Sequence, residues 1–184
     1  MIKTIIMKNI ISILLISLLF ISCERKAGKR IYEHSSQITC ICDKGLCDYC
    51  VKVIGITDGD TFKGLTDDKQ VIRFRIYGID TPEKKQAFSN KARQYLSDLI
   101  FEQTVGIKVQ KKNDRYGRPV VWVYTAKGLD VSAEMLKAGM AWHYKDYDST
   151  PEYAEYEIKA KKARLGLWAD NNPVAPWDFK KKKK

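Results

Sequence analysis

Histidine is scarce in this sequence: the 184 residues include two, His34 and His143. Catalytic zinc and non-haem iron centres usually draw on clustered histidines, so the scarcity argues against such a centre. Glycine and proline are also few, with 11 and 5 residues, which excludes a collagen-like chain. A hydrophobic content of 45% is too high for a fully disordered chain, and the composition excludes a polytopic membrane protein. The length is that of one domain with appendages.

An apolar run lies near the start of the chain, from Ile10 to Ile21, after a short basic segment. A basic start, an apolar stretch and a small residue before Cys23 form the plan of a secretory signal. The run is short for a transmembrane helix, which needs about 20 apolar residues.

The end of this run, residues 19–23, resembles a bacterial lipobox. We therefore expect residues 1–22 to be a lipoprotein-type signal peptide and Cys23 to carry lipid after cleavage. The protein is then exported and held as a membrane-anchored lipoprotein, at the cell envelope or cell surface. An ordinary secretion signal and an uncleaved anchor are the alternatives.

Positive charge gathers at the two ends of the chain, which carries 33 Lys and Arg against 22 Asp and Glu, a net charge of +11. Lys3, Lys8 and the five lysines of residues 180–184 supply seven of these charges, and the remainder is +4. A run of like charges is usually solvated, although it can attract nucleic acid or anionic lipid. We expect residues 169–184 to form a C-terminal extension with a solvated lysine tail, in which Trp177 is loosely docked.

Four cysteines lie close together before the first regular segment, at Cys40, Cys42, Cys47 and Cys50. An exported chain meets an oxidising compartment, which favours two disulfides. Four cysteines in so short a stretch can instead bind one zinc ion, and free thiols are a third alternative. We expect residues 23–50 to be a tether that contains a small four-cysteine knot.

From Val51 onward, hydrophobic periodicity and turn residues predict a regular domain over residues 51–168. Ser89 and Asp130 are the expected N-caps of the first two helices, and Pro151 lies in the first turn of the third. Five short strands with a helix between the third and fourth suit an OB-type barrel, which makes the fold class α+β with three helices. The predicted strands cover residues 51–57, 61–65, 71–79, 104–109 and 120–125, and the helices cover residues 87–101, 131–138 and 151–164.

Acidic residues stand at the ends of predicted strands and turns. Asp60 follows an Asp-Gly turn, and Asp80 and Glu83 follow the third predicted strand. Carboxylates at such junctions can converge on one hard cation such as calcium, which takes oxygen ligands. Taken singly, each acid also fits ordinary turn chemistry, because Asp-Gly and Asp-Thr-Pro-Glu are both typical of turns.

Three arginines accompany these acids. Arg73 and Arg75 alternate along a predicted strand and therefore share a face. A buried arginine is costly unless it is paired, and its planar guanidinium suits a two-point contact with phosphate. Arg118 follows Gly117, which allows a sharp turn or a close approach to a ligand. Structural salt bridges with the acids are the alternative interpretation.

Taken together, three segments resemble the staphylococcal nuclease family. They are Asp-Gly-Asp-Thr at residues 58–61, Arg-x4-Asp-Thr-Pro-Glu at residues 75–83 and Asp-x-Tyr-Gly-Arg at residues 114–118. All three are intact and occur in the family's order, and the resemblance covers residues 51–168. Any one of these motifs alone would be a weak signal.

The resemblance implies a calcium site in this domain. Asp60, Asp80 and the main-chain carbonyl of Thr81 correspond to the metal ligands, and Asp58 corresponds to an outer partner of the same site.

The resemblance also implies the catalytic groups. Glu83 corresponds to the general base that activates water. Arg75 and Arg118 correspond to the pair that holds the scissile phosphate and stabilises the charge developing on it. The implied reaction is hydrolysis of phosphodiester bonds in DNA and RNA to 3′-phosphate products, by endo- and exonucleolytic cleavage.

Four further residues resemble those that contact the substrate. Arg115 and Tyr116 match the residues at the terminal phosphate of the nucleotide, and Tyr144 and Tyr147 lie near the base-stacking tyrosines. We expect DNA and RNA as partners, a membrane as a further partner through the lipid on Cys23, and a monomer.

Two other functions compete with this hypothesis. A non-catalytic OB-fold lipoprotein that binds nucleic acid needs no general base, and so does not account for the complete set of acids and arginines. A cationic surface lipoprotein explains the lysine tail and leaves the three motifs unexplained.

Overall fold

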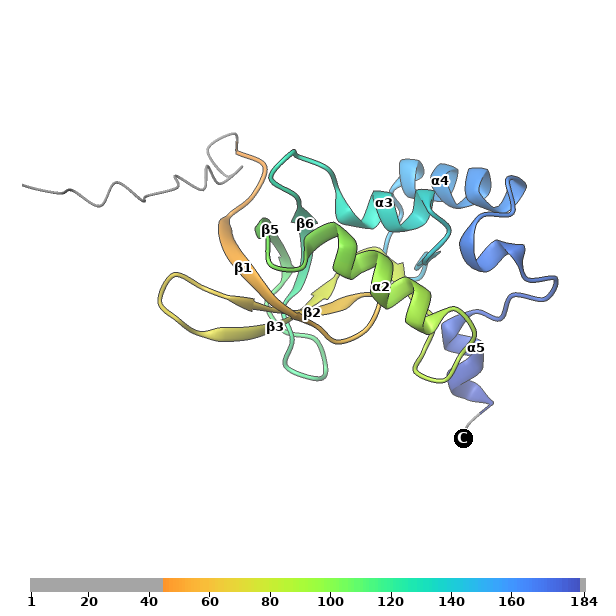
Figure 1. Ribbon diagram of the computed structural model, residues 1–184, viewed down its shortest axis with the longest axis horizontal. Helices are drawn as coiled ribbons and strands as arrows, with labels where there is room; N and C mark the ends of the chain where they lie inside the picture. Colours follow the sequence, from red (N-terminus) through yellow and green to blue (C-terminus); the bar gives the residue numbers. More distant parts are fainter. Residues whose placement is uncertain (1–44, 183–184) are drawn as a thin grey trace, which may run out of the picture. The chain divides into compact units, whose positions relative to one another are not determined.

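The computed structural model describes residues 45–182 (Figure 1). The predicted signal peptide (residues 1–22), Cys23, Cys40 and Cys42 lie outside the described residues. Cys47 and Cys50 are both disulfide-bonded. At these two positions the disulfide alternative therefore agrees with the structure, and neither zinc ligation nor a free thiol does.

Five strands close into a barrel, as the sequence predicts. Around the barrel the strands follow the order β1-β2-β3-β6-β5. All neighbouring strands are antiparallel except β3 and β6, which are parallel. The prediction of an α+β fold with an OB-type barrel is confirmed. The strands are β1 (Tyr49–Ile56), β2 (Thr61–Leu65), β3 (Val71–Ile76), β5 (Thr104–Lys111) and β6 (Val120–Tyr124).

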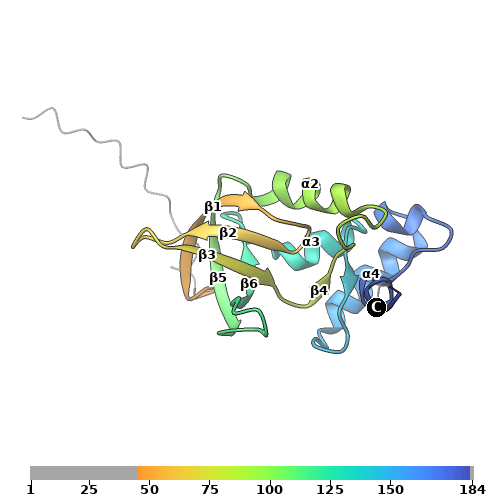
Figure 2. The same cartoon turned by 90° about the horizontal axis from the view of Figure 1, so that it is seen from below.

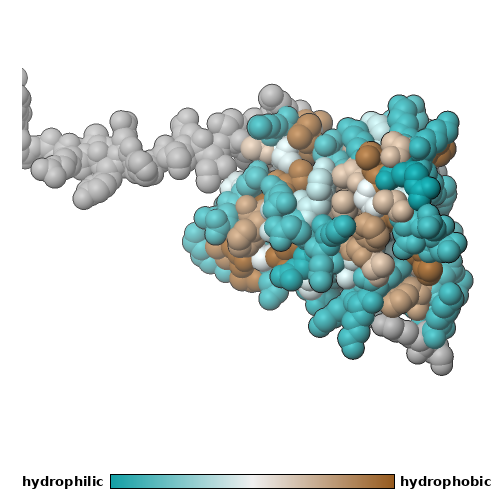
Figure 3. All heavy atoms as spheres, turned by 45° about the vertical axis from the view of Figure 1, so that its right-hand side comes forward, coloured by the Kyte–Doolittle hydropathy of each residue, from teal (hydrophilic) through white to brown (hydrophobic). Residues whose placement is uncertain are grey.

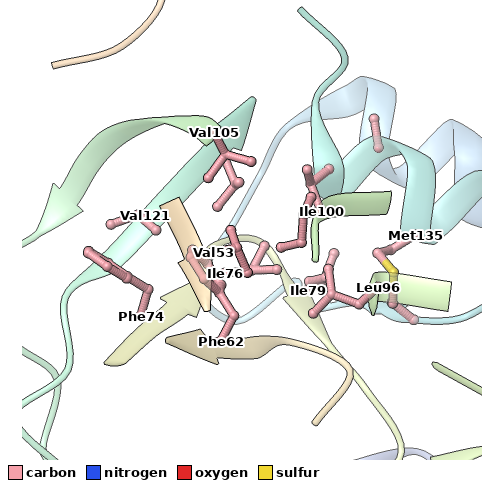
Figure 4. Packing of buried hydrophobic residues seen from close by; sticks show 14 of the residues in the cluster. Val53, Phe62, Phe74, Ile76, Ile79, Leu96, Ile100, Val105, Val121 and Met135 are labelled. Atoms are coloured by element: carbon pink, nitrogen blue, oxygen red, sulfur yellow. The ribbon is translucent and has the colours of Figure 1, made fainter. Parts of the chain in front are cut away.

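The barrel interior is filled by the inward-facing residues of its strands (Figure 4). Phe62 of β2 and Phe74 of β3 are fully buried and stack with their ring centroids 5.2 Å apart. The same apolar core continues beyond the barrel to Leu96, Ile100 and Met135, which belong to two helices. Burial of this continuous core stabilises the barrel and fixes the helices against it.

The three predicted helices are present as α2 (Ser89–Ile100), α3 (Val131–Lys137) and α4 (Pro151–Lys162). Helix α2 contacts β1 and α3, α3 contacts β6, and α4 packs on α3 (Figure 1). Asp130 caps α3 as predicted, since its side chain accepts hydrogen bonds from the N–H groups of Ser132 and Ala133. Pro151 lies in the first turn of α4, also as predicted.

The start of α2 differs from the prediction. Ser89 is the first helical residue rather than the N-cap, and the N-cap is Phe88, with a left-handed φ of 66° and no side-chain cap hydrogen bond. Phe88 packs against the buried residues Ala160, Leu167 and Trp168. Burial of an aromatic ring, rather than a serine hydroxyl, therefore fixes where the chain enters α2.

The third predicted strand is interrupted. Strand β3 ends at Ile76, and a separate short strand, β4 (Ile79–Asp80), pairs antiparallel with β7 (Trp142–His143). Gly78 lies between them with φ 78°, and a Cβ atom there would come within 2.7 Å of the Tyr153 ring. The break redirects the chain, so that β4 leaves the barrel toward the helices (Figure 2).

A fourth helix, α5 (Pro176–Lys181), follows the 3-10 turn η2 (Gly166–Ala169). The expectation of a loosely docked Trp177 is wrong, because this residue stacks on Tyr144 with centroids 5.5 Å apart and planes at 8°. The Trp177 ring also contacts the Trp142 ring edge-on, with the ring centroids 5.7 Å apart. Aromatic packing therefore fixes the segment that carries the first lysines of the tail.

Polar side chains cover most of the face of the domain seen in Figure 3. Within residues 45–182, no helix combines the length and the apolar content needed to cross a membrane.

Candidate active site

The turn between β1 and β2 carries Asp58 and Asp60. The N–H of Asp60 donates to Asp58 Oδ1 at 3.2 Å, and the N–H of Thr57 donates to the Thr61 carbonyl at 2.9 Å. A Cβ atom on Gly59 would lie within 2.9 Å of both Thr81 and Ala92. Only glycine lets the turn pack this closely, and the packing brings Asp60 to the end of β4.

Asp60 and Asp80 face the same guanidinium. Arg75 Nη1 lies 2.7 Å from Asp60 Oδ1, and Arg75 Nη2 lies 2.9 Å from Asp80 Oδ1. The N–H and hydroxyl of Thr81 donate to Asp60 Oδ2 at 2.9 and 2.8 Å. Both carboxylates are buried. The structure thus brings the three predicted metal-site residues and Arg75 into one cluster.

Negative charge exceeds positive charge in this cluster. Four carboxylates act on Arg75, those of Asp58, Asp60, Asp80 and Glu83. The second cation in contact with them is the ammonium of Lys180, at the end of α5. When all six groups are ionised, two negative charges are left without a partner among them.

The pKa values reflect this excess. Burial and the charge of Asp60 raise the pKa of Asp58 to about 7, and the same two causes raise the pKa of Asp80 to about 6. Burial also acts to raise the pKa of Asp60. The charge of Arg75 and the hydrogen bonds from Thr81 outweigh it, so the pKa of Asp60 is lowered. Asp60 is therefore the carboxylate that stays ionised most readily.

The cluster suits a hard dication by its chemistry. Its ligand atoms are oxygens, it carries excess negative charge, and its side chains lie at loop–strand junctions. No three His, Cys, Asp or Glu side chains form a preformed metal cage within the part of the chain that the structure describes. Oδ1 of Asp60 and Oδ1 of Asp80 instead contact Arg75, and Oδ2 of Asp80 lies 3.5 Å from Lys180 Nζ.

Glu83 lies in the loop between β4 and α2. Its N–H donates to Gln86 Oε1 at 2.9 Å, and its carbonyl accepts from the N–H of Gln86 at 2.7 Å. Its side chain is 37% exposed, unlike those of Asp60 and Asp80, and its Oε1 atom lies 2.8 Å from Lys180 Nζ. Glu83 is therefore close to the buried acids while it remains accessible to water.

Arg118 approaches the cluster from the loop between β5 and β6. Asp114 Oδ2 accepts from Arg118 Nε at 2.8 Å and lies 2.7 Å from Arg118 Nη2, while Gly117 makes the turn with φ 74°. The remaining nitrogen, Nη1, donates to Thr61 Oγ1 at 3.3 Å, and this hydroxyl donates to Asp60 Oδ1 at 3.1 Å. Asp114 thus orients Arg118, and one intervening hydroxyl links Arg118 to the acid that pairs with Arg75.

The predicted substrate-contacting residues form two groups at or near the surface. The guanidinium of Arg115 lies 4.8 Å from the centre of the Tyr116 ring, and that of Arg118 lies 5.2 Å from it. Tyr116 is 65% exposed, so the pair stands at the surface beside Arg118. The rings of Tyr144 and Tyr147 contact each other with their centroids 4.7 Å apart, and Tyr147 is 68% exposed.

Sequence reasoning missed three residues near this site: Trp142, Trp177 and Lys180. Trp142 pairs with Asp80 in the β4–β7 ladder, and Trp177 covers one face of Tyr144. One signal was available, since Lys180 follows two aromatic residues, Trp177 and Phe179, that a solvated tail does not need. The uninterrupted lysines after it favoured the opposite interpretation.

Fold and site together define an OB-type barrel that carries an acid–arginine cluster near exposed aromatic rings. The family model described as "Staphylococcal nuclease homologue" matches residues 73–170. This match includes Arg75, Asp80, Glu83 and Arg118, whereas Asp60 precedes it and α5 follows it.

Several curated proteins are similar to the chain over most of its length. A protein of Haemophilus influenzae named as an endonuclease is 40% identical over 145 residues, 79% of this chain and 78% of its own. A micrococcal nuclease of Shigella flexneri is 40% identical over 147 residues, 74% of this chain and 83% of its own. An Escherichia coli protein named as an endonuclease is 34% identical, over 72% of this chain and 85% of its own.

The chain belongs to the staphylococcal nuclease family. It is accordingly a nuclease, which is a hydrolase.

Proposed function

We propose that the protein is a calcium-dependent nuclease that hydrolyses phosphodiester bonds of both DNA and RNA and leaves 3′-phosphate ends. The observation that carries the proposal is the convergence of Asp60 and Asp80 on Arg75, with Glu83 and Arg118 at the edge of the same cluster. A purely structural ion-pair cluster needs neither the exposed Glu83 nor a second arginine at its edge.

Calcium would be held by Asp60, Asp80 and the carbonyl of Thr81. Bound there, it would supply positive charge beside the phosphate and so stabilise the charge that develops during attack. The oxygen ligands and the excess of negative charge in the cluster support this assignment.

The chain's own residues supply the rest of the chemistry. Attack on a phosphodiester adds negative charge to a group that is already negative, so fixed cations aimed at it lower the barrier. Arg118 places its Nη1 atom at the edge of the cluster, and Asp114 binds its Nε atom. Arg75 reaches a phosphate oxygen when it exchanges one of its carboxylate contacts.

Glu83 accepts a proton from the attacking water. The water oxygen bonds to phosphorus, the bond from phosphorus to the 5′-oxygen breaks, and that oxygen takes a proton from solvent and leaves as a hydroxyl. Glu83 suits this role because its carboxylate is open to solvent beside buried acids.

Substrate tolerance follows from the type of contact. Arginine contacts to phosphate position a strand without reading its sequence. The exposed rings of Tyr116 and Tyr147 can stack on any base, which favours single-stranded or frayed segments of DNA and RNA.

The test is digestion of plasmid DNA and of RNA with calcium, followed by excess chelator. We expect degradation that stops on chelation, and a fall in kcat of about 10²- to 10⁴-fold for Glu83→Gln, the usual contribution of a general base. Glu155→Gln, the same change on the exposed surface of α4, serves as the control and keeps full activity.

Two outcomes would overturn the proposal: degradation that is indifferent to chelator, and an unchanged rate for Glu83→Gln. Tight binding of DNA without cleavage would instead support the non-catalytic alternative.

Export and anchoring through lipid on Cys23 are part of the same proposal, and their support is the lipobox-like segment of the sequence. Membrane fractionation of the full chain checks this part. Cys23→Ser should move the protein from the membrane to the soluble fraction, and an unchanged distribution would exclude the lipid anchor. Size-exclusion chromatography with light scattering checks the expected monomer.

A further inference from the structure

The helix α5 brings one lysine of the tail to the general base. Lys180 Nζ lies 2.8 Å from Glu83 Oε1 and 3.5 Å from Asp80 Oδ2, so one ammonium bridges two acids of the cluster.

Packing of the C-terminal segment fixes this arrangement. Trp177 stacks on Tyr144, while Ala175 and Pro176 are buried at the start of α5. Gln86 Nε2 donates to the carbonyl of Val174 at 2.6 Å. Lys180 is therefore delivered by a docked helix, and its reach is limited compared with that of a lysine on a free tail.

Gln86 links the C-terminal segment to the general base directly. The same side chain that binds the Val174 carbonyl accepts a hydrogen bond from the N–H of Glu83. In Figure 1 the segment before α2 accordingly runs beside α5. The backbone of Glu83 is held through Gln86, and its carboxylate is held by Lys180.

We propose that Lys180 is a positioning residue for the nuclease reaction, which it serves by holding the carboxylate of Glu83. The inference rests on the proposed role of Glu83 as general base. With Oε1 bound to Lys180, Oε2 is the oxygen that accepts the proton of the attacking water. The ammonium also offsets the repulsion between Glu83 and Asp80, which would otherwise turn the exposed Glu83 away from the cluster.

The contact serves the geometry of Glu83 more than the stability of the fold. Lys180 is 48% exposed, and ion pairs at such exposed positions contribute little to stability. Misplacement of a catalytic group by about 1 Å, in contrast, can cost about 100-fold in rate.

The neighbouring Lys181 provides a matched control on the same helix. It is 78% exposed, and its ammonium lies 3.4 Å from Asp178. Lys181→Met removes the same charge from α5 as Lys180→Met does, and Lys180→Arg keeps the charge at the cluster.

The experiment measures kcat and KM of the full chain on single-stranded DNA with saturating calcium. Lys180→Met should lower kcat by about 10- to 100-fold with little change in KM. Lys181→Met should keep the wild-type kcat, and Lys180→Arg should restore most of the loss. Calorimetric titration with calcium gives a readout apart from activity: Lys180→Met should bind calcium at least as tightly as the wild type, because a competing cation near Asp80 is gone.

Four outcomes would overturn the inference while the proposed function stands: an unchanged kcat, a higher kcat, a loss confined to KM, and a fall in calcium affinity that matches the fall in kcat. A higher kcat would mean that α5 hinders access of the substrate. A loss confined to KM would mean that Lys180 contacts the substrate phosphate. An inactive wild type would instead overturn the proposed function, and the role of Lys180 with it.

Discussion

Two regions of the molecule supply charges to the same site, and they fix those charges in different ways. The barrel and the short strand β4 beside it contribute Asp60, Asp80 and Arg75, here called the barrel cluster, which are largely buried and bound to one another and to the backbone. The C-terminal segment contributes Lys180, which is half exposed and is held in place by the aromatic packing of Trp177. Buried charges without partners are costly, so the barrel cluster is tied to stability as well as to chemistry, whereas the lysine is tied to chemistry alone.

The variant Arg75→Ala should show the largest difference between the two regions. The change leaves Asp60 and Asp80 buried without their shared partner, and removal of one partner of a buried ion pair typically costs about 3–5 kcal/mol. The free energy of unfolding from urea denaturation, measured in chelator, should fall by about that amount.

The control for this change is Arg73→Ala, which removes an exposed arginine from the same strand and should alter stability by less than about 0.5 kcal/mol. Lys180→Met should resemble this control in stability. Equal losses for Arg75→Ala and Lys180→Met would erase the distinction between the two regions.

The second test asks whether docking of α5 is what places the lysine. Trp177→Ala removes the ring that stacks on Tyr144 and should lower kcat about 10- to 100-fold, as Lys180→Met does, because the ammonium then leaves Glu83. Trp177→Phe keeps an aromatic ring and should keep most of the activity.

The double variant Trp177→Ala/Lys180→Met decides the matter in kcat measurements. Two residues that act through one contact are not additive, so its loss should equal that of either single change. Fully additive losses would show that Lys180 reaches Glu83 without the docked helix.

The two regions also differ in how far the sequence predicted them. The barrel strands and the helices α2, α3 and α4 follow from local signals: alternation, helical periodicity, and turn or capping residues such as Asp130. The three motifs lie at the ends of these elements, and the resemblance to the family, rather than these local signals, implied that Asp60, Asp80 and Arg118 share one site.

Contacts between distant segments were beyond such reasoning. The break at Gly78 depends on the ring of Tyr153, and the start of α2 depends on burial of Phe88 against residues of α4 and η2. The docking of α5 depends on Tyr144 and Gln86. A row of lysines is typical of a solvated tail, and nothing local in the sequence reveals that the first of them meets Glu83.

The smallest expected effect concerns pH and tests whether the barrel cluster carries uncompensated negative charge. The pKa of Asp58 is about 7 and that of Asp80 about 6 in the folded protein, above the usual value of 3.8. Between pH 7 and pH 4 the folded state therefore binds more protons at these sites than the unfolded state does. Their contribution to stability rises as pH falls through this window, is complete below the unfolded pKa, and is lost as pH rises through the folded pKa.

Asp58→Asn removes one of these groups and should flatten the pH dependence, on the order of 1 kcal/mol between pH 7 and pH 4. The measurement is urea denaturation of calcium-free wild type and variant at several pH values, with Asp67→Asn, an exposed turn residue, as the control. Asp114, whose pKa is lowered, acts in the opposite direction at more acid pH in all three proteins and cancels in the comparison, so the difference between variant and wild type reports on Asp58 together with its partner Asp60. Identical slopes for Asp58→Asn and wild type would mean that Arg75 and Lys180 already balance the cluster, and the charge argument for a bound dication would lose its support.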